Sequence, residues 1–265
     1  NSTAIGYRAL KTQNAGAEAY NVAVGVDAGT AVTTGVENTL IGGRAGDALT
    51  VGTMNVALGE RALSADTKGS KTVAIGKQTL ATQNFTSATD SFNTGVGHNA
   101  GYAITTATNN TLIGSLAGDA ITTSNSNTAV GKSALSAETT SNGNTAVGEL
   151  ALGVQNVGGS GDARNTAVGL LAGGAITTGA NNTFVGALAG DGTDDGDGNT
   201  AVGYNSLSAN CGVGNSSVGN FSLNVCTGSS NTAIGDQAGV AVTSGSNNVL
   251  LGHDVGRAGS PGGEI

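Results

Sequence analysis

The sequence predicts an all-β protein, a parallel β-solenoid of about 15 coils built on a mostly seventeen-residue repeat. Three observations predict this fold. A phrase closing on Gly recurs along the whole chain, each copy contains a short run of strand-forming residues, and Gly occurs too often for helices. An ordinary globular core is excluded because one Met, no Trp and 3% aromatic residues supply too little bulk. Disorder is disfavoured because 38% of residues are hydrophobic and 11% are charged.

The repeated phrase reads Asn, then Thr or Val, a small residue, an aliphatic residue and Gly, and it occurs 15 times. Most closing glycines are seventeen positions apart, and two intervals are four positions longer, from Gly76 to Gly97 and from Gly148 to Gly169. The repeat therefore predicts one continuous solenoid domain over residues 1–265. Three copies read Asn-Thr-Ala-Val-Gly; they open on Asn127, Asn144 and Asn199 and close on Gly131, Gly148 and Gly203.

Each phrase predicts a short strand that is apolar on both faces. The aliphatic residue before the Gly and the Thr or Val two places earlier share one face, and the residue between them is small or apolar. One face can point into the coil, and the other then needs a partner chain. A second phrase follows each Gly, so we expect two short strands in every coil, and 15 stacked coils would extend over about 70 Å.

The recurring Asn and Gly have structural roles in this interpretation. Asn opens 13 of the 15 copies, the exceptions being Ser2 and Thr72. Asn tolerates left-handed backbone angles, and stacked amides can form a ladder of hydrogen bonds. The Gly fits a corner that needs a positive φ or the close approach of a neighbouring backbone.

Charge and hydropathy exclude two classes of partner. The net charge is −8 and the ten Lys and Arg residues are scattered singly, which argues against nucleic acid. No apolar run approaches the ~20 residues of a membrane span, so we expect no membrane insertion in this segment. The chain begins at Asn1, which favours a piece of a longer polypeptide.

The copies that open on Asn127, Asn144 and Asn199 resemble the head repeats of YadA-type trimeric autotransporter adhesins. They are more similar still to the long repeats of bacteriophage tail fibres, those of cyanophages in particular. The resemblance covers the whole chain and implies a left-handed β-roll, three chains around a common axis, and a rod that presents a binding surface to a host. This chain differs in its repeat, which is longer than that of the adhesin heads.

No residue pattern predicts catalysis. His98 and His253 each follow a repeat Gly, in a position that also holds Tyr, Glu, Lys, Leu and Asp, and we expect both to face solvent. The sequence predicts no cofactor, with one candidate for structural Ca²⁺. The four carboxylates of the acidic cluster, Asp191, Asp194, Asp195 and Asp197, are spaced by Gly and could supply oxygen ligands, the alternative being a solvated turn.

Two further pairs of residues are candidates. Cys211 and Cys226 occupy nearly the same place in adjacent coils, which is compatible either with a disulfide or with two buried small apolar residues. Phe85 and Phe92 lie in the first long interval, where extra residues are expected to bulge as a binding loop. The alternative is that both rings are buried in a groove between chains.

The sequence favours a non-enzymatic structural protein, a homotrimeric fibre segment of a virion tail fibre or a cell-surface adhesin. Its expected partners are copies of itself and a host cell-surface receptor, with carbohydrate among the candidates. The alternative is a monomeric ligand-binding solenoid of the ice-binding type, which needs a flat and exposed Thr face. The Thr/Val mixture in the first strand position favours a packed face instead.

Overall fold

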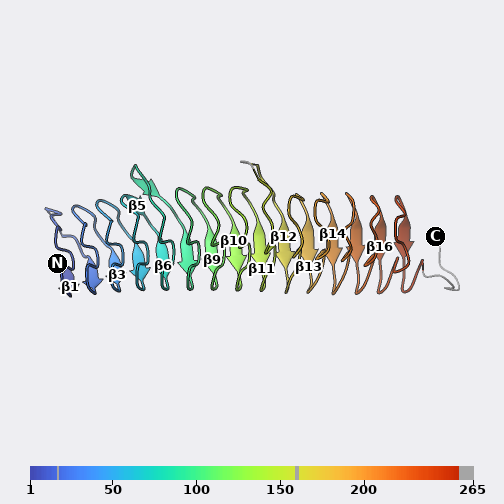
Figure 1. Cartoon of the computed structure of the whole chain (residues 1–265), viewed down its shortest axis with the longest axis horizontal. Coiled ribbons are helices and arrows are strands. Elements are labelled where there is room, and N and C mark those ends of the chain that lie inside the picture. Colours follow the sequence, from blue (N-terminus) through green and yellow to red (C-terminus); the bar gives the residue numbers. More distant parts are fainter. Residues whose placement is uncertain (17, 159–160, 257–265) are drawn as a thin grey trace. The chain divides into compact units, whose positions relative to one another are not determined.

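The computed structural model describes residues 1–16, 18–158 and 161–256, and every regular element within them is a β-strand. The chain divides into two compact units, unit 1 over residues 1–132 and unit 2 over residues 133–265. Each unit is a parallel β-solenoid whose coils follow one another in chain order (Figure 1). None of the described residues belongs to a helix that could cross a membrane.

The strands are short, and their bounds follow the repeat. Unit 1 contains β1 (Thr3–Ile5), β2 (Val22–Val24), β3 (Thr39–Ile41), β4 (Val56–Leu58), β5 (Gly69–Ser70), β6 (Val73–Ile75), β7 (Thr89–Asp90), β8 (Thr94–Val96), β9 (Thr111–Ile113) and β10 (Thr128–Val130). Unit 2 contains β11 (Thr145–Val147), β12 (Thr166–Val168), β13 (Thr183–Val185), β14 (Thr200–Val202), β15 (Ser216–Val218), β16 (Thr232–Ile234) and β17 (Val249–Leu251).

Within each unit the main strands pair in parallel and in register. In β3 and β4, for example, Thr39 pairs with Val56, Leu40 with Ala57 and Ile41 with Leu58. Like positions of the repeat therefore stack directly on one another, and each position forms a column. The pair β5 and β7 forms a separate two-stranded parallel sheet, and β7 lies within the first long interval.

The expectation of two strands per coil is wrong, because the phrase after each repeat Gly forms turns. The second residue after the repeat Gly has a φ between 53° and 61° in every coil, and the fourth has a φ between 47° and 80°. The fourth position includes seven leucines, among them Leu63 and Leu135, which rarely adopt a left-handed conformation. Two left-handed residues so close together bend the chain continuously, which no strand allows.

The repeat Gly is required by both conformation and space. Its φ lies between +126° and +142° in all 15 coils, a region that residues with a Cβ avoid. At Gly42 an added Cβ would lie 2.5 Å from the carbonyl oxygen of Gly59 in the next coil, closer than real Cβ atoms approach. The column of glycines thus lets successive coils approach to the spacing of a β-sheet.

The Asn column forms a ladder of buried side chains. The Oδ1 of Asn21 accepts a hydrogen bond from the backbone N of Asn38 at 2.8 Å, and the Nδ2 of Asn38 donates to the carbonyl of Gly52 at 2.9 Å. The same pattern recurs in unit 2, where the Oδ1 of Asn182 accepts from the backbone N of Asn199 at 2.8 Å. The expected left-handed angle lies one residue earlier than the Asn, as at Glu37, whose φ is 60°.

The two exceptions in the Asn column use hydroxyl groups in place of the amide. Ser2 accepts the backbone N of Asn21 on its Oγ at 3.2 Å. The backbone N of Thr72 donates to the Oδ1 of Asn55, and its hydroxyl lies 2.6 Å from that of Ser91. The ladder thus continues through a residue that has no amide.

The interior of a coil is filled by one large side chain, which occupies the space left by a Gly in the turn. Leu40 is the buried middle residue of β3, and a Cβ added at Gly29 or Gly46 would clash with its methyl groups. Phe184 in β13 is enclosed in the same way by Gly173 and Gly190. In β4, where the middle residue is Ala57, the turn supplies the buried Leu63 instead. This exchange of volume maintains dense packing with few bulky residues.

Candidate functional site

The strands direct two of their three residues outward, and these columns form an apolar outer face in each unit. The outward face is defined here by the first and third residues of each main strand. In unit 1 the third residue is half-buried or exposed in every strand, with Ile5, Leu58 and Ile113 exposed by 60%, 44% and 39%. The middle residues Ala23, Leu40, Ala57 and Leu112 are fully buried. The strand is therefore apolar on both sides, and only the inner side is covered within the chain.

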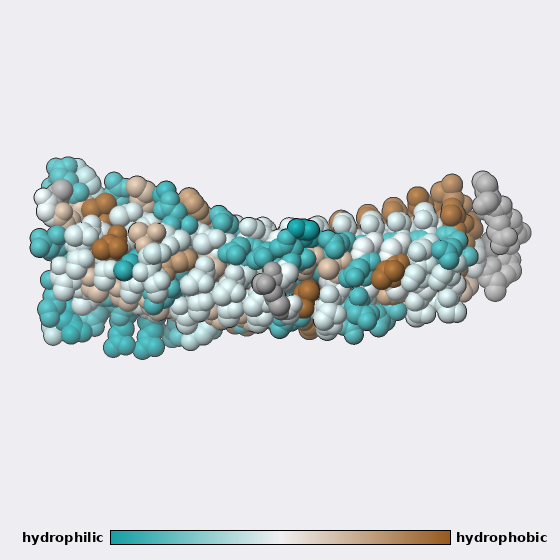
Figure 2. All heavy atoms as spheres, turned by 90° about the horizontal axis from the view of Figure 1, so that it is seen from above, coloured by the Kyte–Doolittle hydropathy of each residue, from teal (hydrophilic) through white to brown (hydrophobic). Residues whose placement is uncertain are grey.

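Unit 2 has the same outward face. Val168, Val185, Val218, Ile234 and Leu251 are all exposed by more than a third. Figure 2 shows a row of apolar side chains along one edge of the visible face, over the C-terminal strands of this unit. The first strand position adds half-buried or exposed Thr, Ser or Val in every coil. The outward face is thus a regular row of exposed aliphatic side chains in each unit.

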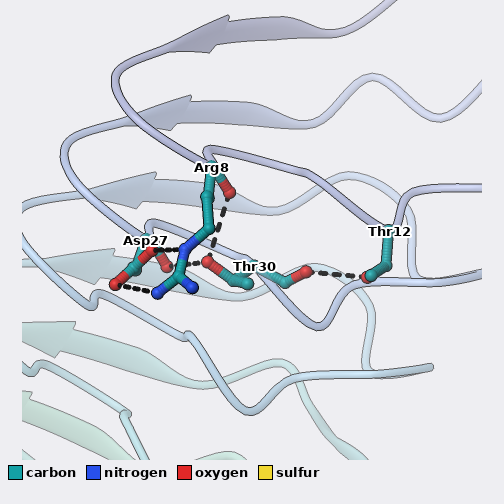
Figure 3. Close-up of polar contacts among 4 residues, drawn as sticks. All are labelled: Arg8, Thr12, Asp27 and Thr30. Carbon is teal, nitrogen blue, oxygen red and sulfur yellow. Dashed lines mark hydrogen bonds and ion pairs between the residues drawn. The ribbon is translucent and has the colours of Figure 1, made fainter.

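Charged side chains gather at the corner, defined here as the two residues that follow each repeat Gly. The guanidinium of Arg8 donates from Nε to Oδ1 of Asp27 at 2.6 Å and from its terminal NH₂ to Oδ2 at 2.8 Å (Figure 3). This hydrogen-bonded ion pair lowers the pKa of Asp27. The Thr30 hydroxyl donates to the Asp27 carbonyl at 2.8 Å, and the Thr12 hydroxyl donates to the Thr30 carbonyl at 2.7 Å. The corner is thereby tied to the next coil through side chains as well as backbone.

The four carboxylates of the acidic cluster do not converge. Asp194 accepts the hydroxyl of Thr177, and Asp197 accepts the backbone N of Ala180 at 2.7 Å, so each binds its neighbouring coil. Asp195 is exposed and Asp191 is half-buried. Among the described residues no three His, Cys, Asp or Glu side chains are grouped to hold a metal ion. The structure thus brings these four carboxylates to no common point, and Ca²⁺ binding by this segment stays a prediction.

The two cysteines are free and buried, so the structure contains no disulfide between Cys211 and Cys226. The Sγ of Cys211 lies 3.2 Å from the hydroxyl of Thr193, and the Nδ2 of Asn231 donates to the Sγ of Cys226 at 3.3 Å. Burial raises the pKa of both thiols. They occupy the core as small apolar residues that have polar neighbours.

The two phenylalanines of the long interval have different surroundings. Phe85 is buried, with its ring against Gly69, so it is a core residue and is not available for binding. Phe92 is 53% exposed, and the ammonium of Lys71 lies 5.2 Å from the centre of its ring. Lys71 also pairs with Asp90 of β7 at 2.6 Å. Of the two, only Phe92 lies on the surface.

The two histidines lie in different units, His98 in unit 1 and His253 in unit 2, and both are exposed as expected. The Nε2 of His253 lies 3.3 Å from the carboxylate of Asp236, which precedes it in the same corner column.

Two buried acid–amide pairs stand next to the long intervals, and the sequence analysis missed both. In unit 1, Asp66 accepts hydrogen bonds from the backbone N of Gly69 at 2.9 Å and from the Nε2 of Gln83 at 2.7 Å. The Oε1 of Gln83 in turn accepts the Nδ2 of the ladder residue Asn93 at 2.9 Å. All these side chains are fully or almost fully buried. They connect the base of the inserted segment to the Asn ladder.

Unit 2 repeats this device with Glu in place of Asp. Glu138 accepts the backbone N of Thr139, Thr140 and Ser141 at 2.8–2.9 Å, and Gln155 donates to its second oxygen at 3.0 Å. The Oε1 of Gln155 accepts the Nδ2 of Asn165 at 2.9 Å.

The two acid–amide pairs reveal a second, longer period in the sequence. The interval from Asp66 to Glu138 equals the interval from Gln83 to Gln155, and it spans four coils plus one insertion. This longer period was therefore visible in the sequence.

The longer period also places an Asp with an unpaired buried oxygen in one column of three coils. Asp47, Asp119 and Asp191 each have a buried Oδ1 without a hydrogen-bond partner. Partial burial raises the pKa of all three carboxyl groups. In the coil after each of these Asp residues, the same position holds a Ser whose hydroxyl donates to a backbone carbonyl one coil further on, at 3.0–3.3 Å. These hydroxyls belong to Ser64, Ser136 and Ser208. A carboxylate has no proton with which to make this hydrogen bond.

Comparison of this chain with known protein families, with characterised proteins and with solved structures finds no match.

Proposed function

We propose that this chain is a structural fibre segment that assembles as a homotrimer by burying the outward face of its strands. The observation that supports the proposal is the outward face itself, in which one aliphatic side chain per coil lies half-buried or exposed in both units. A second copy fits this face best, because its columns have the same layer spacing and the same sequence of Thr and aliphatic residues.

The energetics support association through this face. Covering one exposed Val, Leu or Ile completely contributes about 1 kcal/mol or more. The cost of bringing two proteins together is roughly 4–15 kcal/mol. Each unit repeats its aliphatic residue in seven or eight main strands, which together contribute an amount comparable with this cost, whereas a few isolated apolar residues would not.

The proposed role is mechanical and includes no catalysis. The stacked coils would extend a receptor-binding region from a virion tail fibre or a cell surface, as the resemblance to tail-fibre and adhesin repeats implies. The left-handed sense of the coil and the three-fold packing also belong to this proposal.

The native mass tests the proposal. Light scattering should give three times the single-chain mass of 25.4 kDa for the native protein, and the single-chain mass after denaturation. The variant Ile113→Glu places a charge on the outward face and should reduce the native mass or make it depend on concentration. Val51→Glu is the matched control, because Val51 is 38% exposed, close to the 39% of Ile113, and lies outside the outward face. A wild-type mass equal to that of one chain at all concentrations would refute the trimer.

The alternative, a monomeric ligand-binding solenoid of the ice-binding type, has one observation in its favour. The first strand position holds Thr in most coils, and this column is at least partly exposed in each of them. A monomer that shows thermal hysteresis, lost on replacing Thr128 and Thr145 with Val, would support this alternative. A trimer without hysteresis would exclude it.

A further inference from the structure

Five of the ten cations of this acidic chain are corner residues of unit 1, and four of them gather in its first five coils although they are far apart in the sequence. Arg8, Arg44 and Arg61 are the second residues after their repeat glycines, in the first, third and fourth coils. Lys77 is the first residue after the repeat Gly of the fifth coil. Stacking of the seventeen-residue repeat brings these positions together.

The two carboxylates at this corner are already neutralised by other cations. Asp27 is bound through both oxygens by Arg8, and Glu60 lies 3.0 Å from the ammonium of Lys77. Arg44 and Arg61 are both exposed. In the part of the chain that the structure describes, neither guanidinium makes a hydrogen bond to a carboxylate. Both guanidinium groups also interact with the partly buried carboxylate of Asp47, but their N–H donors remain available to an external anion.

The backbone holds these two arginines side by side. Arg44 and Arg61 have φ values of 58° and 57°, and the backbone N of Arg61 donates to the carbonyl of Gly43 at 3.0 Å. Their Cα atoms therefore belong to adjacent layers, which are ~4.8 Å apart in a β-stack. Planar guanidinium groups at this spacing are suited to paired hydrogen bonds with the oxygens of a carboxylate or phosphate.

A shallow hollow of about 270 Å³ lies beside the arginines, lined by Val26, Gly43, Arg44, Glu60 and Arg61. Its cause is Gly43, which has no side chain where Val26 and Glu60 in the same column have one. An added Cβ at Gly43 would have no atom within 4 Å, so this space is open. The hollow is too small for a large ligand and comparable with the smallest ligand pockets.

We propose that this hollow binds one acidic sugar unit of a saccharide. Arg44 and Arg61 bind its carboxylate or phosphate, Val26 contacts the apolar face of the ring, and Glu60 accepts a hydrogen bond from a ring hydroxyl. The carboxylate of Glu60 at the rim is paired with Lys77 but keeps lone pairs that can accept hydrogen bonds, so it favours a ligand that has O–H donors next to its anionic group over a free anion. The hollow lies within unit 1 of one chain, so this inference is independent of the trimer.

Calorimetric titration of the full chain with trigalacturonic acid tests the proposal, with maltotriose and inorganic phosphate as the neutral and free-anion probes. Trigalacturonic acid should bind, and maltotriose and phosphate should bind at least about tenfold more weakly. Equal binding of phosphate would overturn the sugar assignment, and equal binding of maltotriose would overturn the role of the arginines. No binding of trigalacturonic acid up to 10 mM, used as about the weakest affinity of interest, would overturn the site.

Matched variants assign the binding to the hollow. Arg44→Gln with Arg61→Gln should weaken trigalacturonic acid binding by about tenfold or more, because two charge-assisted contacts are lost. The control, Lys68→Gln with Arg164→Gln, removes the same charge elsewhere and should leave the affinity within about twofold. Gly43→Leu fills the hollow without changing charge and should also abolish binding. Equal effects of the two charge variants, or no effect of Gly43→Leu, would overturn the site.

Native mass, measured on the same samples, separates the two proposals. Saccharide binding by a monomer would refute the fibre trimer and support this site. A trimer that does not bind trigalacturonic acid would refute the site and leave the trimer standing.

Discussion

Replacing Gly42 by Ala should destabilise the protein by about 3–5 kcal/mol, whereas the same change at the adjacent Gly43 should have little effect. Gly42 has a φ of +133°, and an added Cβ would lie 2.5 Å from O and 2.6 Å from C of Gly59. The strained backbone costs about 1–3 kcal/mol. Relieving the contact requires the two coils to separate by about 0.5 Å or more. This separation would lengthen two backbone hydrogen bonds between the coils, from Gly59 N to Ile41 O at 2.7 Å and from Arg61 N to Gly43 O at 3.0 Å. Each bond weakened there costs roughly 1 kcal/mol.

Gly43 is the internal control for this prediction. It has no positive φ and no atom within 4 Å of an added Cβ, so Ala should change stability by no more than about 0.5 kcal/mol, or raise it slightly. Urea unfolding followed by far-UV circular dichroism measures both variants. Because each coil contacts only its neighbours, Gly42→Ala should lower the midpoint or divide the transition in two. If both variants unfold within about 0.5 kcal/mol of each other, the steric reasoning is refuted.

Three further predictions concern the columns. Asn182→Ala leaves the backbone N of Asn199 without its acceptor and should lower the free energy of unfolding in urea by about 2–4 kcal/mol. The control Asn220→Ala, at an exposed position, should lower it by less than about 0.5 kcal/mol. Equal losses would contradict the hydrogen-bonded ladder. Burial raises the pKa of Asp119, so its stability contribution is present at low pH and is lost as the pH rises through that pKa. The variant Asp119→Asn should therefore raise the free energy of unfolding by about 0.5 kcal/mol at most at pH 7 and by nothing below about pH 4. A gain in stability at low pH would refute this. Glu138→Ala and Gln155→Ala should show a coupling energy of about 1–3 kcal/mol in a double-mutant cycle, and additivity would refute their pairing.

The sequence was informative wherever one residue type serves one geometry. Gly in the closing position predicted a positive φ or close approach, and the structure has both. Period-two spacing predicted which strand residues share a face, and the parallel registers agree with it. The β-solenoid class and the seventeen-residue repeat followed from these columns alone.

The turns could not be predicted, because their residues contradict local preference. Leu63 and Leu135 have φ values of 53°, which only the surrounding stack can impose. Phe85 was a candidate for a binding loop because its interval is four residues longer, with a groove between chains as the alternative, but Gly69 leaves room for its ring in the interior of the coil. The arginine pair was missed for a different reason. Arg44 and Arg61 look isolated in the sequence and become neighbours only when residues one repeat apart are compared.

The distribution of constraint along the repeat indicates where binding specificity can change. The repeat Gly cannot accept a side chain, the ladder Asn is bonded to both neighbouring coils, and the strand interior is fixed by the exchange of volume between Leu40 and its two glycines. The first residue after the repeat Gly differs as widely as Tyr7, Val26 and Glu60, because its side chain leaves the stack and is at least partly exposed. A substitution there alters the surface without altering the coil. If the chain recognises a ligand through one coil stack, this first corner position is where stability and recognition can vary independently, and the hollow at Gly43 in unit 1 is its most specialised example.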